Sequence, residues 1–346
     1  MGDALYGKTR GEVAGKLNAA INDKNKGLPS LDDKKTLEQF LRDWIKDVAK
    51  PRVRPRTFES YSCFIDYHII PALGKSVLTK LTPQHVQQLL NEKSESGLAA
   101  ETVRHIHSTL RCALNDAVRW GLVHRNVASL ASPPKLEKRE LHVFTIEQTN
   151  NLLEAVSNER LEIVFWIAIY LGLRRGEILA LRWQDINFDS QTMHVCGTLQ
   201  RVARSLQLTE TKTESSRRTL PIPDVLLAKI KTHRSNQLQD RLKAGSSWQE
   251  KDLVFTTKYG TPVEPRNLVR RFHEILKAAK LPKIRFHDLR HSCATLLLTK
   301  GVSMRTLMDV LGHSKISQTM DTYAHVLPET KREAINLMDT ILNRTN

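Results

Sequence analysis

A nearly all-apolar segment in the middle of the chain constrains the fold most. Residues 160–171 carry few polar side chains, and the sequence Gly-Leu-Arg-Arg-Gly-Glu follows at 172–177. A helix that is apolar all round, and shorter than the roughly 20 residues of a membrane span, must lie inside a protein core. We therefore expect Arg174 and Glu177 at the edge of that core. These residues alone support two interpretations equally: an ion pair that caps two helices, and a functional site.

The N-terminal third of the chain predicts a small helical bundle. Apolar residues recur at helical spacing after good N-cap residues, and proline or glycine follows. The expected helices cover residues 36–48, 57–70 (ended by Pro71 and Gly74), a run from Thr82-Pro83, and 102–121. Residues 50–57 are expected to form a loop that carries several cations. Four helices joined by short connections favour a bundle.

The chain is strongly basic, with a formal net charge of +16 and 40% hydrophobic residues. This balance indicates a folded protein whose partner is a polyanion, and nucleic acid is favoured over a membrane surface. No apolar run reaches a membrane span, and no signal peptide is recognisable. Residues 129–142 predict a basic linker that runs along DNA. Candidate phosphate contacts, unless they merely form a solvated face, are Arg52, Arg54, Arg56, Arg104, His105, Arg111, Lys135, Lys138 and Arg139.

Alternating residues between 183 and 222 predict a small antiparallel sheet. Residues 185–189 lead to a strand at 192–195, and residues 209–213 lead to another at 217–222. Lys212 falls at the turn between two strands. Such a lysine is usually solvated, but its long ammonium arm could also reach a groove and donate a proton. Further along, residues 252–255 predict a short strand and residues 267–279 a basic amphipathic helix.

The residues between 284 and 346 hold the expected chemistry. His287, Arg290 and His291 share one face of a helix because they lie three and four positions apart. A helix over 304–311 ends at Gly312, a segment at 319–326 carries Tyr323, and a last amphipathic helix covers 329–342. A tyrosine hydroxyl attacks poorly at neutral pH unless a base and positive charge assist it. Arginine forks match the oxygens of a phosphate, so attack on a phosphate is the predicted reaction.

The cysteines argue against a metal centre or a disulfide framework. The four cysteines are scattered without a Cys-x-x-Cys pair, and no carboxylate cluster suggests a magnesium site. This usage fits a reducing cytoplasm, with the protein on the nucleoid when it binds DNA. We expect no metal and no cofactor, because cations can do what a metal ion does at other phosphoryl-transfer sites.

Five motifs in order resemble the tyrosine recombinases, also called the phage integrase family. They are Gly-Leu-Arg-x-Gly-Glu, Thr-Lys-Thr, His-x-Leu-Arg-His, Leu-Gly-His and Thr-Tyr-x-His. Residues 54–74 resemble the core-site DNA-binding domain of that family, which adds Thr57 to the candidate DNA contacts. The resemblance covers nearly the whole chain. It implies a two-domain DNA clamp, mainly α with a small antiparallel β-sheet: a helical core-binding bundle and an α+β catalytic domain.

The resemblance also implies a role for each matching residue. Tyr323 is the nucleophile, which forms a 3′-phosphotyrosine and frees a 5′-hydroxyl. Arg174 and Arg290 hold the non-bridging phosphate oxygens, Lys212 is the general acid for the leaving oxygen, and His287 is a general acid/base. His313 hydrogen-bonds the phosphate, and Glu177 supports Arg174 or His287. His291 matches the motif, but we expect it to pack or bond locally.

The expected domains follow from these assignments. Residues 31–128 form the core-site DNA-binding domain, 129–142 the linker and 143–328 the catalytic domain. Residues 329–346 form a helix that docks on a neighbouring protomer. Residues 1–30 hold a leader helix over 11–26, interpreted as the remnant of a truncated arm-binding domain; a loosely attached helix is the alternative.

The predicted function is site-specific DNA recombination, with integrase and excisionase activity, through a Holliday junction and without ATP. The expected partners are double-stranded DNA with specific sites, three further copies in a homo-tetramer on two duplexes, and candidate accessory proteins, a DNA-bending protein and an excisionase. No membrane is expected. The alternatives are a resolvase or invertase of the same family, a type IB topoisomerase, and a DNA-binding regulator that has lost activity. The sequence does not separate a phage from a conjugative element.

Overall fold

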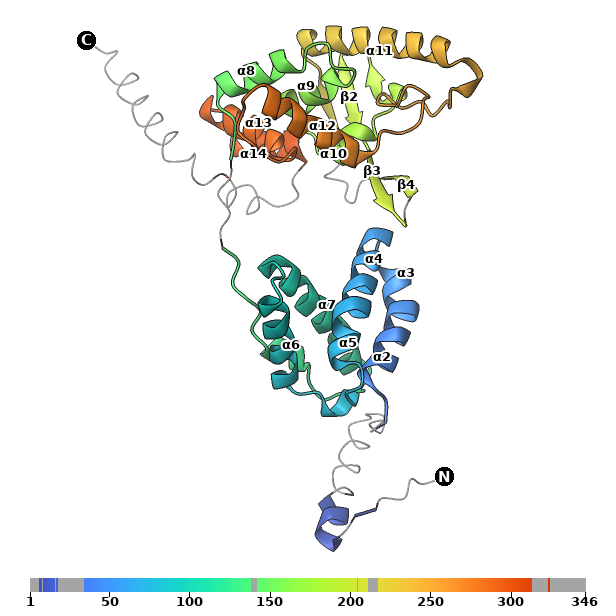
Figure 1. Ribbon diagram of the computed structural model, residues 1–346, viewed down its shortest axis with the longest axis vertical. Helices are drawn as coiled ribbons and strands as arrows, with labels where there is room; N and C mark the ends of the chain where they lie inside the picture. The colour runs from blue at the N-terminus through green and yellow to red at the C-terminus, as the bar shows by residue number, and fades with distance from the viewer. Residues whose placement is uncertain are drawn as a thin grey trace, which may run out of the picture. The chain divides into compact units, whose positions relative to one another are not determined.

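The computed structural model describes residues 6–7, 9–15, 17, 34–137, 142–203, 205–210, 217–312 and 323. The chain divides into two compact units, residues 1–138 and 139–346 (Figure 1). The domain bounds expected from the sequence stay predictions. Of the expected leader helix, residues 11–15 and 17 are helical, whereas 16 and 18–26 lie outside the described residues.

The first unit is the predicted helical bundle. Its α-helices are α2 (Leu37–Trp44), α3 (Lys50–Arg52), α4 (Pro55–Phe64), α5 (Ile70–Leu73), α6 (Pro83–Glu95) and α7 (Ala100–Arg119). Thr36 caps α2 and Thr82 caps α6, each through a reciprocal capping box with the residue three positions on. Leu41, Trp44, Ile69, Ile106 and Leu110 are among the buried residues of its core.

Two prolines continue helices that they were expected to end. Residues 50–57 do not form a loop, because Lys50–Arg52 extend the first helix and α4 begins at Pro55. Pro71 likewise lies inside a helix that runs to Leu73. A proline removes one N–H and its ring crowds the carbonyl four residues earlier. A π-helical stretch comes just before each of these helices, Ile45–Ala49 and Ile65–Ile69. We attribute the tolerance to these wider turns.

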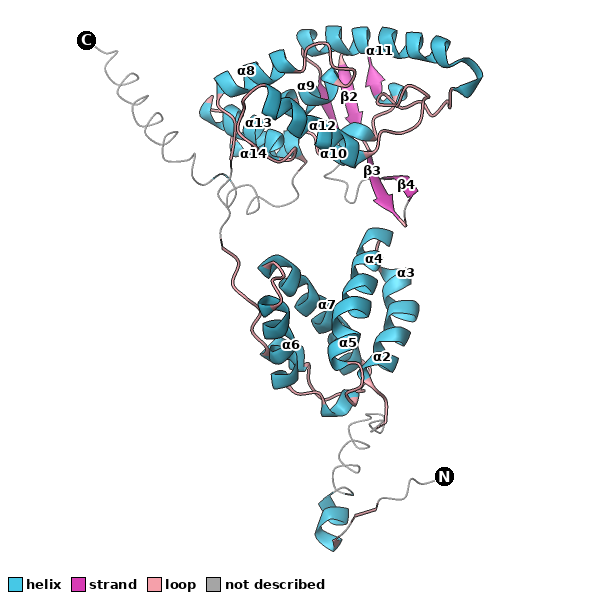
Figure 2. Cartoon of the chain, in the orientation of Figure 1, coloured by secondary structure: helices cyan, strands magenta, loops and turns pink. Residues whose placement is uncertain are grey.

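The second unit combines helices with two small sheets (Figure 2). Its helices are α8 (Ile146–Ala155), α9 (Glu162–Tyr170), α10 (Arg175–Leu179), α11 (Asp224–Ala244), α12 (Pro265–Ala278), α13 (Asp288–Thr299) and α14 (Met304–Leu311). Strands β1 (Ile186–Asn187), β2 (Thr192–Val195) and β5 (Arg218–Pro221) form an antiparallel sheet in the order β1-β2-β5. Strands β3 (Gly197–Val202) and β4 (Ser205–Glu210) pair as a separate antiparallel hairpin.

The sheet prediction was partly right. The strands at 192–195 and 218–221 are confirmed, and they pair directly, with Met193 opposite Leu220. The β3–β4 hairpin was missed, and the strand expected at 252–255 was wrong. That segment makes one isolated bridge, of Leu253 with Arg182, and the next residue, Thr256, makes another with Pro262. It is held instead by side chains, as described below.

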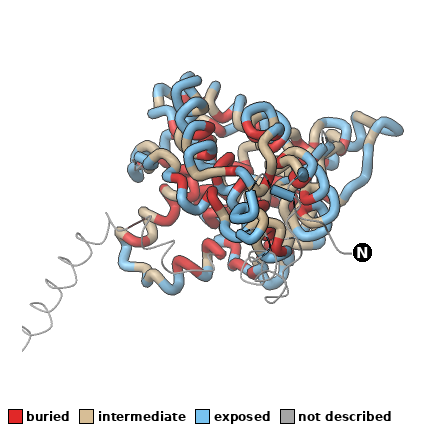
Figure 3. Tube along the Cα trace, turned by 90° about the horizontal axis from the view of Figure 1, so that it is seen from below, coloured by how far each residue is buried: buried red, intermediate tan, exposed pale blue. Residues whose placement is uncertain are grey.

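Helix α9 is the predicted buried helix of the second unit. Ile163, Val164, Phe165, Ile167 and Ala168 are all at most 2% exposed. The helix contacts α8, α10, α11 and α13, so most of its faces are covered (Figure 1). Figure 3 shows the buried residues of the described chain in red. Burial of this apolar surface is a main source of stability for the unit. Among the described residues, no helix is long and apolar enough to cross a bilayer.

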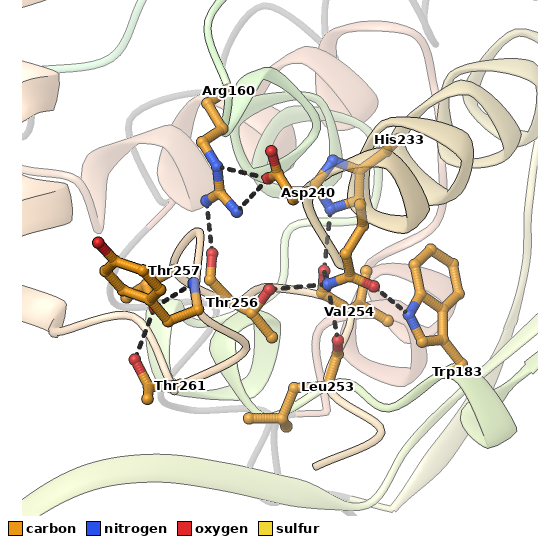
Figure 4. A network of polar contacts seen from close by, with 11 residues as sticks. Arg160, Trp183, His233, Asp240, Leu253, Val254, Thr256, Thr257 and Thr261 are labelled. Atoms are coloured by element: carbon orange, nitrogen blue, oxygen red, sulfur yellow. Dashed lines mark hydrogen bonds and ion pairs between the residues drawn. The ribbon is translucent and has the colours of Figure 1, made fainter. Parts of the chain in front are cut away.

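A buried polar network fastens residues 252–256 to α11 (Figure 4). The Gln237 amide accepts a hydrogen bond from the Trp183 indole at 2.7 Å and donates to the Leu253 and Val254 carbonyls and to the Thr256 hydroxyl. Arg160 pairs with Asp240 and donates to the Thr256 carbonyl. The segment therefore satisfies its polar groups without belonging to a sheet.

Candidate active site and DNA-binding residues

The turn after α9 positions the first arginine of the site. Gly172 has φ +59°, and a Cβ atom there would meet the Leu311 side chain at 2.6 Å. Arg174 then caps α10, and its Nη1 donates to Glu177 Oε1 at 2.7 Å. The backbone N–H of Arg174 donates to the other carboxylate oxygen at 3.0 Å. The sequence left open an ion pair or a functional site; the ion pair is present.

A second arginine, which the sequence analysis did not single out, holds the same carboxylate. Arg218 begins β5, and its Nη2 donates to Glu177 Oε2 at 3.0 Å. The two side chains are only 7% and 4% exposed. Burial raises the pKa of Glu177, but the charges of Arg218 and Arg174 outweigh burial and leave that pKa below its ordinary value. Glu177 is therefore a buried carboxylate between two guanidinium groups.

A third arginine, Arg290 on α13, is 1% exposed. Its Nη1 donates to the Gly172 carbonyl at 2.7 Å and its Nη2 to the Leu311 carbonyl at 2.6 Å. Burial, and then the charge of Arg174, lowers the pKa of Arg290 to about 9. The guanidinium accordingly remains charged at neutral pH.

The three arginines converge on one helix end. The carbonyls of Val310, Leu311 and Gly312, at the C-terminus of α14, accept hydrogen bonds from Arg218 (2.7 Å), Arg290 (2.6 Å) and Arg174 (3.4 Å). A helix C-terminus carries partial negative charge, which favours cations there. Helix α14 has the bounds expected from the sequence, because Ser303 caps its start and Gly312 adopts the left-handed conformation at its end.

Two histidines and the tyrosine lie beside this cluster. His287 precedes α13, and its ring meets the ring of His291 edge-on, with centroids 5.0 Å apart. Nδ1 of His291 lies 2.8 Å from the Tyr323 hydroxyl oxygen, and Tyr323 is fully buried. Burial raises the pKa of Tyr323 and lowers the pKa values of both histidines. His291 therefore packs locally against His287, as expected, and also contacts a residue that is distant in sequence.

Several expected site residues lie outside the described residues. These are Lys212, His313, Lys138 and Arg139, together with the helix expected at 329–342 and the segment expected at 319–326, of which only Tyr323 is described. Within the second unit, the structure does bring together Arg174, Glu177, Arg290 and Tyr323. Their roles stay predictions. Arg218 could have been found only through its partners, because nothing in the alternating pattern of its strand distinguishes it from a solvated arginine.

In the first unit, Arg52 is held by a buried carboxylate. Asp116 is 4% exposed and lies 2.9 Å from Arg52 Nη2. It also accepts a hydrogen bond from the Trp44 indole at 2.8 Å. Burial raises the pKa of Asp116, but hydrogen bonds from Arg52 and Trp44 outweigh burial and leave that pKa below its ordinary value. This arrangement gives Arg52 a structural partner in addition to any DNA contact.

The other candidate DNA contacts of this unit lie on α4, α7 and the segment after it. Arg56 pairs with Glu59 at 3.1 Å, Arg104 donates to the Pro134 carbonyl at 3.2 Å, and the His105 ring stacks on Phe64. Arg111 and Lys135 are exposed, and Arg54 and Thr57 are partly exposed. Their contact with DNA stays a prediction.

Comparison with known proteins identifies the family. Residues 142–330 match the phage integrase family, and residues 36–94 match the phage integrase N-terminal SAM-like domain. A protein named tyrosine recombinase XerC-like, from Caldanaerobacter subterraneus, is 30% identical over 97% of this chain and 91% of its own. The chain therefore belongs to the phage integrase family of tyrosine recombinases and is a site-specific recombinase, an enzyme that transfers DNA strands.

Solved structures agree on the fold. The Tn1549 transposon integrase, in complex with transposon right end DNA, aligns with a TM-score of 0.75 at 19% identity, covering 88% of this chain and all of that one. A lambda integrase tetramer bound to a Holliday junction aligns with a TM-score of 0.62 at 20% identity, covering 91% and 88%. The predicted two-domain fold, mainly α with small antiparallel sheets, is confirmed. A DNA-binding regulator without activity is not favoured.

Proposed function

We propose that this recombinase cuts double-stranded DNA by attack of the Tyr323 hydroxyl on the scissile phosphate. The bond between Oη and phosphorus forms, the bond from phosphorus to the 5′-oxygen breaks, and a 3′-phosphotyrosine and a 5′-hydroxyl result. Religation reverses these steps and needs no ATP, because the phosphotyrosine keeps the energy of the cut bond. The observation that carries the proposal is the convergence of Arg174 and Arg290 on adjacent carbonyls beside the buried tyrosine.

Arg174 and Arg290 then serve as a clamp for the non-bridging oxygens of the phosphate. Their guanidinium groups lie close enough together to donate to successive residues, Leu311 and Gly312. Phosphoryl transfer places negative charge on these oxygens, and planar guanidinium forks match them in geometry and charge. Glu177 holds Arg174, and the carbonyls of Gly172 and Leu311 hold Arg290, so both guanidinium groups are oriented in the chain without DNA.

The remaining roles rest on the motifs of the family. Lys212 protonates the leaving 5′-oxygen, and His313 donates a hydrogen bond to the phosphate. Burial lowers the pKa of His287 to about 4, and the charges of His291, Arg290 and Arg174 add to this effect. His287 is therefore neutral at neutral pH and able to act as a general acid/base at the phosphate.

We propose that the working assembly is a homo-tetramer on two DNA duplexes, which passes through a Holliday junction. The support is the fold shared with the lambda integrase that was solved as a tetramer on such a junction. The last helix, expected at 329–342, would dock on a neighbouring protomer. A DNA-bending protein and an excisionase are candidate further partners, and we propose action in the cytoplasm, on the nucleoid.

The test is a covalent-complex assay on a denaturing gel. The protein and its Tyr323→Phe variant are incubated with labelled DNA from the junctions that flank the protein's own gene. An SDS-resistant protein–DNA band that disappears with Tyr323→Phe is the expected result. A band of equal intensity in the variant would contradict the assignment of the nucleophile. Tyr61→Phe is a matched control, because it removes a hydroxyl from the first unit.

A further inference from the structure

The contact of His291 with the proposed nucleophile differs from the contacts of His233 and His107, two other histidines among the described residues that are at least partly buried. Its Nδ1 lies 2.8 Å from Oη of Tyr323, which is distant in sequence. By contrast, His233 and His107 bond backbone carbonyls, of Val254 at 2.9 Å and Ala128 at 2.7 Å. A carbonyl can only accept, so these two rings must donate. A phenol can donate to an unprotonated ring nitrogen, which is the geometry of a proton transfer.

We infer that His291 is a catalytic residue, the general base that removes the phenolic proton of Tyr323 during strand cleavage. This inference rests on the proposed function, in which Tyr323 is the nucleophile. The proton passes from Oη to Nδ1 as the Oη–phosphorus bond forms. The bond to the 5′-oxygen breaks, and the general acid protonates that oxygen. In religation the imidazolium returns the proton to the departing phenolate as the 5′-hydroxyl attacks.

Burial of His291 favours the neutral ring that this role requires. Burial lowers the pKa of His291, Asp288 opposes this, and the cations Arg285 and Arg290 add to it. His287 faces the ring from the preceding turn, and Tyr323 faces it from the C-terminal segment. Burial of the phenol raises the pKa of Tyr323, so its hydroxyl stays protonated until a base accepts the proton.

The position of His291 on α13 keeps it beside the phosphate-binding arginine. Arg290 and Tyr323 are both buried in the DNA-free chain, at 1% and 0% exposure. Access of a phosphate to Arg290 therefore requires an opening, and the nucleophile must reach the same phosphate. His291 follows Arg290 directly on the same helix, so it moves with that arginine and remains within reach of a tyrosine that attacks there.

The experiment compares wild type with His291→Asn in single-turnover formation of the covalent complex. Asparagine keeps a polar group near the position of Nδ1 but cannot take up a proton at neutral pH. The substrate carries sulfur in place of the bridging 5′-oxygen, because a thiolate leaves without a general acid. On this DNA a loss reports on the nucleophile alone. His194→Asn makes the same change at an exposed histidine bonded to Thr219 rather than to Tyr323.

We expect His291→Asn to form the covalent complex about 10²-fold or more slowly on both the oxygen and the sulfur substrate. A loss smaller than about tenfold on the sulfur substrate, or a faster reaction, would overturn the inference. A faster reaction would mean that His291 holds Tyr323 in a resting position. Failure of the proposed function is a separate result, because Tyr323→Phe would then still form the complex.

The dependence of the rate on pH keeps the test valid if the variant is partly unfolded. In wild type the rate should level off at pH values above the lowered pKa of His291. In His291→Asn it should keep rising by about tenfold per pH unit toward the raised pKa of Tyr323, since the phenol must ionise unaided. The shape of this profile does not depend on the folded fraction, and parallel profiles would overturn the inference.

Discussion

Each unit of this recombinase has a buried carboxylate between two arginines, and the two clusters differ in the further contacts of these arginines. In the first unit, Asp116 holds Arg52 and Arg119, whose side chains are 42% and 74% exposed. In the second, Glu177 holds Arg174 and Arg218, at 38% and 7%. The Glu177 arginines continue to carbonyls of α14, whereas the hydrogen bonds of Asp116 tie α2, the short α3 and α7 together.

This difference separates a stabilising cluster from a positioning one. The hydrogen bonds of Asp116 connect only helices of the bundle, so replacing Asp116 should destabilise the bundle and leave the rate of DNA cleavage unchanged. Glu177 connects α10 with β5, and its two arginines connect both elements with the end of α14. Replacing Glu177 should therefore displace Arg174, which is proposed to bind the phosphate. A buried ion pair by itself does not show whether its residues stabilise the fold or position catalytic groups. The further hydrogen bonds of its members distinguish these two roles.

The largest effect is expected from Arg290→Lys. Lysine keeps the charge but cannot donate to the Gly172 and Leu311 carbonyls in the planar arrangement of a guanidinium. Formation of the covalent complex should slow by about 10²–10³. Single-turnover kinetics on saturating DNA measure this, with Arg270→Lys on α12 as the matched control. A rate within about threefold of wild type would remove Arg290 from the phosphate clamp.

Arg218→Met should slow cleavage by roughly tenfold to a hundredfold while DNA affinity changes little, because the residue acts through Glu177 and α14. A neutral methylphosphonate at the cleaved position separates positioning from folding. That substrate needs less help from the arginine clamp, so the loss should shrink on it. An equal loss on both substrates would indicate general damage to the fold.

Asp116→Asn should lower the free energy of unfolding by about 1–3 kcal/mol, because the Arg52 and Trp44 donors lose an anionic acceptor. The pKa of Asp116 is lowered in the fold, so its contribution is present above the unfolded pKa and is lost as pH falls through the folded one. Urea titrations at pH 7 and pH 3 measure both, with the exposed Asp66→Asn as control. Equal stability losses at both pH values would contradict the charged role, as would a reduced cleavage rate on saturating DNA.

The smallest effect should distinguish Arg111 from Arg52 in DNA binding. Arg111 is exposed on α7, so Arg111→Gln should weaken binding to all sequences alike and reduce the salt-dependence slope by about one. Arg52→Gln should lower the free energy of unfolding and leave the salt-dependence slope nearly unchanged, because Asp116 already pairs with that guanidinium. Binding isotherms over a range of salt concentrations test both. Identical slopes for the two variants would contradict a mainly structural role for Arg52.

The sequence predicted elements whose ends carry strong local signals. Ser303 and Gly312 set α14, and Thr145 sets the start of α8 through its capping box with Gln148. The β3–β4 hairpin lacked such a signal, because its turn contains Ala203 with φ +46° where glycine or asparagine is usual. The π-helical stretches before Pro51 and Pro71 were equally hidden, since local rules treat proline as a helix end.

Prediction of the site residues from the sequence was limited in the same way, by the absence of a local signal for some of them. Arg174, Glu177, Arg290 and Tyr323 belong to recognisable motifs, so their meeting could be expected from the sequence. The contacts of Arg218 and His291 arise only when β5, α13 and the C-terminal segment come together. Arg218 does not differ in its local pattern from an ordinary strand arginine, and the motif that contains His291 does not reveal the contact of His291 with Tyr323. The contacts of these two residues therefore became visible only in the folded structure.

The most direct measurement is mass spectrometry of the covalent protein–DNA complex after digestion with trypsin and nuclease. The predicted result is a nucleotide attached through its 3′-phosphate to the tryptic peptide 316–331, whose single tyrosine is Tyr323. Attachment to one of the other tyrosines would contradict Tyr323 as the nucleophile, and attachment through a 5′-phosphate would contradict the proposed direction of strand cleavage.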